Sequence, residues 1–282
     1  MLLNHRVIYS DNGFITDISN DMSDINVGTK VIPMVVGEDY IYVGSEMPFN
    51  HRYISVTVAN DVTAVASVEL WDGDSWEAAL DVQDFTSVSG KSLAQSGIIM
   101  WSLDPNKQWL SDDTNYNSQT ITGLSDARIM GLYWARISFS ATLKNTTAIK
   151  YIGHKFATDD DLKLRYPDLI RSNVYTQFLA GKTNWEEQHI ICAENIITDL
   201  KKKNVVKSAN QIIDWRLFTE ASVYKLAELI FTAFGRDYDV SRENAANKYK
   251  QALSMGQYNL DTNMDTRLNP IESQTTQGFL KR

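Results

Sequence analysis

The first half of the chain alternates apolar and polar residues with a period of two. Ile54, Val56 and Val58 alternate with Ser55 and Thr57. The same alternation recurs in two further stretches, residues 66–70 and 133–139. Because successive side chains of a strand point to opposite faces of a sheet, this pattern predicts half-buried antiparallel strands.

Turn residues separate these stretches. Asp72-Gly73 lies between a strand that ends at Trp71 and one that carries Trp76, which predicts a hairpin. Other breaks fall at Gly and Pro positions, namely Gly37, Gly44, Gly90, Gly97, Pro105 and Gly123. About seven or eight short strands at this spacing favour an antiparallel β-sandwich or jelly-roll-like domain. We expect it over residues 27–156, after an extended N-terminal segment, residues 1–26.

The period changes after Phe156. Five residues of one stripe are spaced by three or four and predict an amphipathic helix of about five turns: Trp185, His189, Cys192, Ile196 and Leu200. Thr183 and Glu186 have the spacing of a capping box at its start.

A second helix is predicted from Thr219, as N-cap, to Gly235, whose lack of a side chain suits a helix C-terminus. Shorter helices are expected over 159–166, near 209–218 and over 242–255. The chain is therefore predicted to be multidomain, β then α, with a small helical bundle over residues 157–256.

Composition fits a folded chain in both halves. Of the 282 residues, 43% are hydrophobic and 22% are charged. Apolar runs of 18 residues and a signal-peptide pattern are both missing, so we expect no membrane segment. The single cysteine, Cys192, cannot form an internal disulfide, which suits synthesis in a cytoplasm.

The charge balance bears on nucleic-acid binding. The formal net charge is −8, and the only short basic run is residues 201–203. Because affinity for DNA depends on neutralising phosphates, such a chain is a poor candidate for gripping DNA. An acidic surface would instead let DNA pass without sticking.

Catalytic residues are not apparent, and we predict a non-enzymatic protein. The histidines lie far apart, and His189 sits on an apolar stripe, as a hydrogen-bonded core histidine does. Cys192 has the position of an inert small hydrophobe. Gly90-Lys91-Ser92 resembles the end of a phosphate loop, but Phe85 replaces the required glycine, so a plain turn is expected. A hydrolase would have only scattered turn carboxylates to use, namely Asp72, Asp74 and Asp84.

Tryptophans are concentrated in the first half of the chain: Trp71, Trp76, Trp101, Trp109 and Trp134. They would fill the core of a sandwich, since large aromatic side chains dominate such packing. Alternatively, they would form a stacking platform for a glycan, as in a glycan-binding module. Both interpretations stay open at this point, with core packing favoured.

One segment has the chemistry of a metal site. A twelve-residue EF-hand loop binds calcium through oxygens at fixed positions, which correspond here to Asp261, Asn263, Asp265, the Arg267 carbonyl, Asn269 and Glu272. The glycine expected at the sixth position is Thr266, and Pro270 is unusual before a helix. The loop is therefore a degenerate candidate, and calcium is the one cofactor that the sequence suggests.

The last segment, residues 257–282, has no long apolar stripe. It carries an apolar pair followed by a basic pair: Phe279, Leu280, Lys281 and Arg282. Apolar side chains on a polar segment would be exposed in isolation, so we expect these four residues to dock on a neighbouring protein.

Two groups of motifs resemble proteins of tailed bacteriophages. Residues 42–51 (YVGSEMPFNH), 70–76 (LWDGDSW), 92–97 (SLAQSG) and 131–136 (GLYWAR) resemble β-sandwich modules of phage structural proteins. Residues 159–162 (DDDL), 166–169 (YPDL), the helix with Ala193 and residues 221–228 (ASVYKLAE) are similar to the head-to-tail adaptor family, whose members are small helical bundles.

The resemblance implies a structural virion protein in the phage neck. Copies of the chain would form a homo-oligomeric ring of roughly twelve subunits that docks on the portal protein and prolongs the DNA channel. The ring would also contact other neck or tail proteins. Genomic DNA would pass through without specific binding. The large N-terminal sandwich departs from the simplest adaptors, so its task is left open.

Overall fold

A computed structural model describes residues 5–104, 106–112, 121–124, 131–255 and 260–261. The chain divides into two compact units, the first ending at Gly153 and the second beginning at His154. The change of hydrophobic period predicted this division at Phe156.

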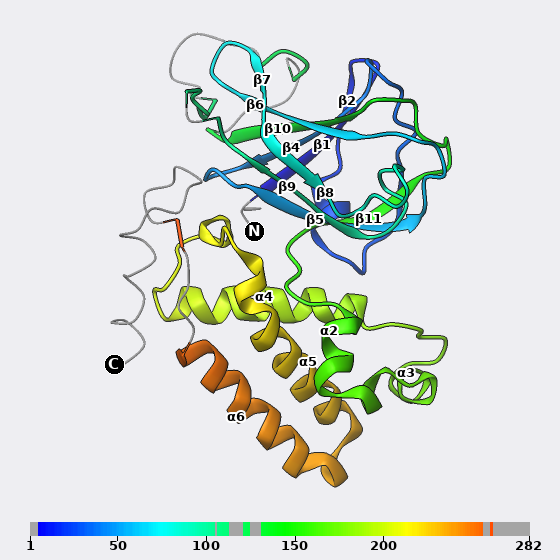
Figure 1. The fold of residues 1–282 in the computed structure, drawn as a ribbon, viewed down its shortest axis with the longest axis vertical. Coiled ribbons are helices and arrows are strands. Elements are labelled where there is room, and N and C mark those ends of the chain that lie inside the picture. The colour runs from blue at the N-terminus through cyan, green and yellow to red at the C-terminus, as the bar shows by residue number, and fades with distance from the viewer. Residues whose placement is uncertain (1–4, 105, 113–120, 125–130, 256–259, 262–282) are drawn as a thin grey trace. The chain divides into compact units, whose positions relative to one another are not determined.

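The first unit consists of two antiparallel sheets and one short helix (Figure 1). The six-stranded sheet has the order β2-β1-β4-β10-β6-β7, formed by β1 (His5–Asp11), β2 (Phe14–Asp17), β4 (Tyr40–Ser45), β6 (Ala66–Trp71), β7 (Trp76–Ala78) and β10 (Tyr133–Phe139). The five-stranded sheet has the order β3-β11-β5-β9-β8, formed by β3 (Lys30–Val31), β5 (His51–Val58), β8 (Leu80–Asp84), β9 (Gly97–Ser102) and β11 (Ala148–Gly153). Helix α1 (Ser19–Ser23) follows β2.

The two sheets share one apolar core. Side chains from both sheets belong to the same buried cluster, including Val43 and Ile137 from the larger sheet and Ile54, Ile99 and Ile152 from the smaller one. The predicted alternation is present in β6, where Ala66, Val68 and Leu70 are buried. Strand β5 differs, because Ser55 is only 1% exposed and the strand is buried on both faces from His51 to Ser55, whereas Val58 at its end is exposed.

The Asp72-Gly73 hairpin is confirmed. Trp71 pairs with Trp76 across β6 and β7, and Asp72 N donates to the Ser75 carbonyl over 3.1 Å. Asp72 Oδ1 accepts from the backbone of Asp74 and Ser75 at 2.8 and 2.7 Å. The carboxylate therefore closes the turn that its short side chain predicts.

A second, smaller apolar cluster covers the outer face of the six-stranded sheet. Trp134 is fully buried there with Tyr42 and Trp71, below Ile121 and Leu124. The buried carboxylate of Asp112 accepts from Trp134 Nε1 over 2.6 Å. The face of β10 that carries Arg136 and Ser138 is therefore buried at Trp134.

The second unit is helical. Its helices are α2 (Asp159–Arg165), α3 (Ser172–Phe178), α4 (Glu186–Lys202), α5 (Thr219–Phe234) and α6 (Asp239–Met255), joined in part by short 3₁₀ turns, η1 (Pro167–Ile170), η2 (Ala209–Gln211), η3 (Trp215–Phe218) and η4 (Arg236–Tyr238). Coarsely, the predicted order of β structure followed by α structure is confirmed.

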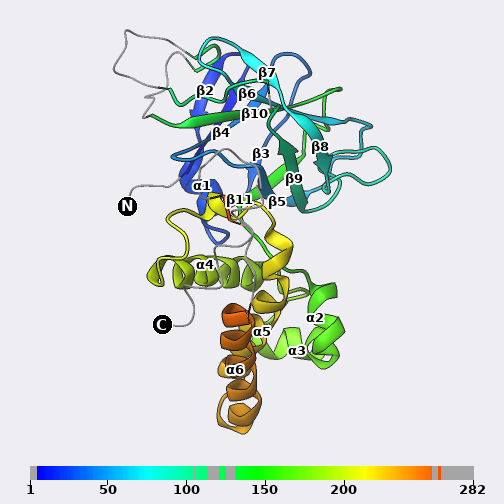
Figure 2. The same cartoon turned by 60° about the vertical axis from the view of Figure 1, so that its left-hand side comes forward.

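Helix α5 is the centre of this unit, since apolar clusters lie on two of its faces. One cluster includes Ala221 and Tyr224, and the other includes Leu226 and Ile230. Helix α6 runs beside α5 in both views (Figure 1, Figure 2).

The starts of the two long helices differ from prediction. Helix α4 begins at Glu186 after Trp185, and the expected capping box of Thr183 and Glu186 is not formed. Instead, Asn184 Oδ1 accepts from Glu186 N over 3.1 Å. Thr219 is the first residue of α5 rather than its N-cap, and its hydroxyl donates to the Phe156 carbonyl. Gly235 ends α5 with φ 86°, as predicted.

Candidate functional site

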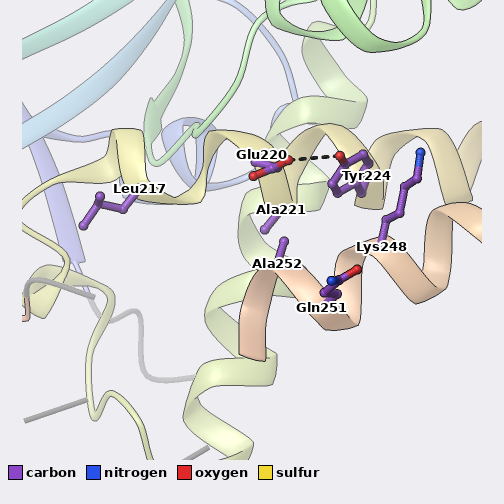
Figure 3. Close-up of a pocket in the computed structure, with 7 residues that line it drawn as sticks. All are labelled: Leu217, Glu220, Ala221, Tyr224, Lys248, Gln251 and Ala252. Carbon is purple, nitrogen blue, oxygen red and sulfur yellow. Dashed lines mark hydrogen bonds between the residues drawn. The ribbon is translucent and has the colours of Figure 1, made fainter. Parts of the chain in front are cut away.

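A groove between α5 and α6 is the strongest candidate site in the helical unit (Figure 3). Its volume is about 390 Å³. It is lined from the run before α5, from the first turns of α5 and from the last turns of α6, by Leu217, Glu220, Ala221, Tyr224, Lys248, Gln251 and Ala252.

The floor of the groove is made of small side chains. Ala221 on α5 and Ala252 on α6 face the groove (Figure 3). Helix α6 is held by one stripe with a spacing of four, in which Ala245, Tyr249 and Leu253 are buried. Because an alanine on each helix reaches no further than its Cβ, the space beside this stripe stays open.

Tyr249 anchors α6 beside the groove. Its hydroxyl donates to Asp199 Oδ2 over 2.7 Å, and Lys225 Nζ lies 4.9 Å from the centre of its ring. Burial, followed by the hydrogen bond to Asp199, raises the pKa of Tyr249. The phenol therefore stays neutral and fixes α6 against α4.

The rim of the groove carries charges of both signs. Glu220 Oε1 accepts from the Tyr224 hydroxyl at 3.0 Å and pairs with Arg165 at 3.2 Å. Arg165 and Lys248 lie 5.6 and 5.5 Å from the centre of the Tyr224 ring. Burial and Glu220 together raise the pKa of Tyr224, so this hydroxyl is a hydrogen-bond donor rather than a base. An apolar floor with a charged rim suits the docking of a peptide segment better than bond cleavage.

A second polar cluster joins α2, α3 and α4. Asp159 accepts from the Tyr175 hydroxyl at 2.9 Å, from His189 Nε2 at 3.1 Å and from Trp185 N at 3.2 Å. Burial acts to raise the pKa of Asp159, but these bonds hold it below its ordinary value. Lys155 is close enough to this cluster to feel its charge, and burial lowers the pKa of its ammonium.

This cluster has the composition of a catalytic dyad but not its accessibility. His189 is fully buried, and burial lowers its pKa, so the ring is neutral at pH 7 and donates from Nε2. Its Nδ1 has no hydrogen-bond partner among the described residues. A substrate could not reach either nitrogen without opening the core. The cluster therefore holds the helices together through hydrogen bonds, as expected for a core histidine.

Cys192 is not placed as a nucleophile, and the turn at Gly90 is not a phosphate-binding loop. The Cys192 thiol is buried, and burial raises its pKa to about 12, which leaves it unreactive. Val88 and Lys91 bridge across a turn, and Gly90 adopts φ 77° at its tip. Residues 91–104, directly after the turn, contain no helix, so no helix N-terminus follows it to cradle a phosphate.

Most of the tryptophans weighed as a glycan platform are packed inside the first unit. Trp71, Trp101, Trp109 and Trp134 are at most 6% exposed. Trp76 is half-buried and donates from Nε1 to the Thr122 carbonyl. Four buried rings cannot stack on a sugar, so the structure favours their role in packing.

The predicted calcium loop lies largely outside the described residues. Only Asp261 of the six candidate ligands is described; it is buried, and its backbone exchanges bonds with Gln211 at 2.9 and 3.0 Å. Asn263, Asp265, Arg267, Asn269 and Glu272 are not described, so calcium binding stays a prediction. Within the described residues, His, Cys, Asp and Glu side chains do not gather in threes around a metal-sized space.

The predicted docking residues also lie outside the described part of the chain. They are Phe279, Leu280, Lys281 and Arg282. For the described helices, none has both the length and the apolar character needed to cross a bilayer.

The groove itself was not predicted from the sequence. Ala221 and Tyr224 lie within the helix that carries the adaptor resemblance, but Ala252 is 31 residues further along the chain. Single alanines at positions of two different helices give no local signal. Comparison of the chain with protein-family models, with curated proteins and with solved structures finds no match.

Proposed function

We propose that this protein is a structural component of a tailed-bacteriophage virion, an adaptor that joins the portal to the tail in the neck. Copies of the chain form a closed ring of roughly twelve subunits that prolongs the DNA channel. In this proposal the two sheets form a jelly-roll-like β-sandwich, and the helical unit is the small bundle of the adaptor family.

The observation that carries the proposal is the groove between α5 and α6. It lies on the helical unit, at the segment 221–228 that resembles adaptor proteins, and its small floor and charged rim suit a protein segment. The neighbouring polar groups with catalytic composition, Asp159 and His189, are occupied with each other inside the core. Assembly is therefore better supported than catalysis.

The charge of the chain is compatible with a channel. A formal net charge of −8 gives DNA few phosphate contacts, so a moving duplex would not be held. The first unit would point outward from the ring, where its sheets brace a neighbouring neck protein or a fibre.

Labelling of whole virions tests the proposal. A gold-binding tag at the N-terminus, imaged by electron microscopy of purified particles, is expected at the junction of head and tail. Label at the tail tip or on fibres would reject the neck assignment and favour the glycan-binding alternative. Unlabelled virions with free tagged protein would reject both.

Truncation gives a second test. Deleting residues 277–282 is expected to leave the circular dichroism spectrum unchanged and to block head–tail joining, so that filled heads and free tails accumulate. A normal yield of infectious particles would refute the docking role of Phe279 and Leu280.

A further inference from the structure

The groove between α5 and α6 has a floor of alanines and a charged rim. A segment of this chain with apolar and basic side chains would match both. We infer that it receives residues 277–282 of a second copy of this protein, with Phe279 and Leu280 on the alanine floor. The inference rests on the proposed function, since it supplies the contact between neighbouring subunits of the ring.

The apolar part of the match is one of size. The floor at Ala221 and Ala252 has no side chain longer than a methyl group, and Leu217 at its edge is 39% exposed. A groove of about 390 Å³ is in the range that encloses a compact ligand and has room for a phenylalanine side chain.

The polar part of the match is one of charge. Glu220 stands at the rim with its side chain 50% exposed, and both Tyr224 and Arg165 contact its Oε1. Its second oxygen can therefore accept from a cation. Glu220 lies next to Ala221 at the start of α5 (Figure 3). Lys281 and Arg282 follow the apolar pair directly, so that a segment with Phe279 on the floor would bring a basic side chain to Glu220. Lys248, at the α6 side, disfavours the reverse direction.

The geometry of a ring indicates a second copy as the source. The groove and residues 277–282 are different surfaces of one chain, and a contact between two different surfaces of identical subunits is heterologous, which is the kind that closes rings. The described chain ends with Leu260 bridged to Ile212 and Asp261 bonded to Gln211. The chain from Asp261 to Phe279 spans at most roughly 60–65 Å when fully extended, so the reach of residues 277–282 is not limited to the surface next to Asp261.

Disulfide trapping between two separate variants tests the inference directly. One full-length variant carries Leu217→Cys at the groove, and the other carries Gly278→Cys beside the apolar pair. Native Cys192 is buried, so it contributes little background. Mixing the two under mild oxidation is expected to give a cross-linked heterodimer. Absence of the heterodimer overturns the inference.

Two controls make the trapping specific. Val240→Cys is 75% exposed at the opposite end of α6 and should cross-link to Gly278→Cys at least about tenfold less. Filling the groove with Ala252→Leu should reduce trapping at Leu217→Cys by about tenfold, whereas Ala233→Leu on the exposed face of α5 should not. Thermal unfolding of each variant verifies that it is folded. Equal trapping at Val240→Cys, or no effect of a folded Ala252→Leu variant, overturns the inference.

The double variant with both cysteines in one chain decides the source of the segment. An intramolecular disulfide without heterodimers in the mixed sample would show that the segment covers its own groove, and this overturns the second-copy inference.

These outcomes can be told apart from those of virion labelling. Neck label without trapping rejects this contact alone, whereas trapping with label elsewhere rejects the neck assignment and keeps the contact.

Discussion

At the scale of single residues, the packing of the Trp134 ring depends on the absence of a side chain at Gly44. The two residues pair across β4 and β10. A Cβ placed on Gly44 would lie 2.8 Å from three atoms of the Trp134 ring. Because Trp134 is fully buried and bonded to Asp112, its ring has no free direction in which to move.

We therefore expect Gly44→Ala to destabilise the first unit by about 1–3 kcal/mol through overpacking. Urea unfolding followed by tryptophan fluorescence measures the change. Trp134→Leu costs stability by itself, but combined with Gly44→Ala the loss should be clearly smaller than the sum of the two single losses. Additive losses would contradict the packing explanation.

Buried histidines make stability depend on pH. Burial, with Arg52 as a second cause, lowers the pKa of His5 to about 4 and that of His51 to about 3. Burial also lowers the pKa of His189. In the unfolded chain these rings bind a proton near pH 6.5, so the unfolded state takes up more protons than the folded state below that pH.

The free energy of unfolding should therefore be fully present above about pH 6.5 and fall as the pH drops toward about 4, with His51 extending the loss toward about 3. Urea titrations across this range measure it. In the folded protein, the imidazole resonance of His51, whose pKa burial lowers to about 3, should not titrate above about pH 5. A flat stability profile from neutral pH to about 5 would contradict the assignment.

At the scale of elements, helix α4 receives its N-terminal cap from a distant residue. Asp159, at the start of α2, accepts from Trp185 N, and it also holds His189 one turn further along α4. A carboxylate at a helix N-terminus satisfies an unpaired N–H group and interacts favourably with the helix dipole. One side chain thus fixes the positions of α2 and α4, and of α3 through Tyr175.

Asp159→Ala is expected to lower the stability of the helical unit by about 2–4 kcal/mol, since it removes a cap and leaves the buried His189 without its acceptor. Asp159→Asn keeps one oxygen and should cost less. Hydrogen exchange by mass spectrometry should show faster exchange in the first turns of α4. As a matched control, Asp160→Ala, at an exposed neighbouring position, should have little effect.

At the scale of the whole molecule, the chain contains separate apolar cores. The clusters of the sheets are formed by residues up to Ile152, and those of the helices by residues from Phe156 onward. A unit with its own core can fold alone.

Fragments 1–153 and 154–282 should therefore each unfold in a cooperative thermal transition. Their circular dichroism spectra are expected to be those of a β-rich and a helical protein, and their sum should approach the spectrum of the full chain. A fragment 154–282 without a cooperative transition would show that the helical unit depends on the first unit for its stability.

The sequence by itself determined the local structure where a short-range rule was sufficient. The alternation in β6, the turn at Asp72-Gly73 and the end of α5 at Gly235 all depend on neighbours within a few residues, and all three are confirmed. The inert character of Cys192 also follows from its place between apolar helix residues.

Only the tertiary structure decided which distant residues meet. Asp159 and Asn184 provide the acceptors at the start of α4, Trp134 is buried in the smaller apolar cluster rather than in the core that the two sheets share, and Ala221 and Ala252 line a groove between two helices. The pattern of one helix or strand specifies which face is apolar, but the partner of that face is chosen by packing between segments far apart in the chain. The order of β structure followed by α structure was therefore readable from the sequence, whereas the candidate docking groove was not.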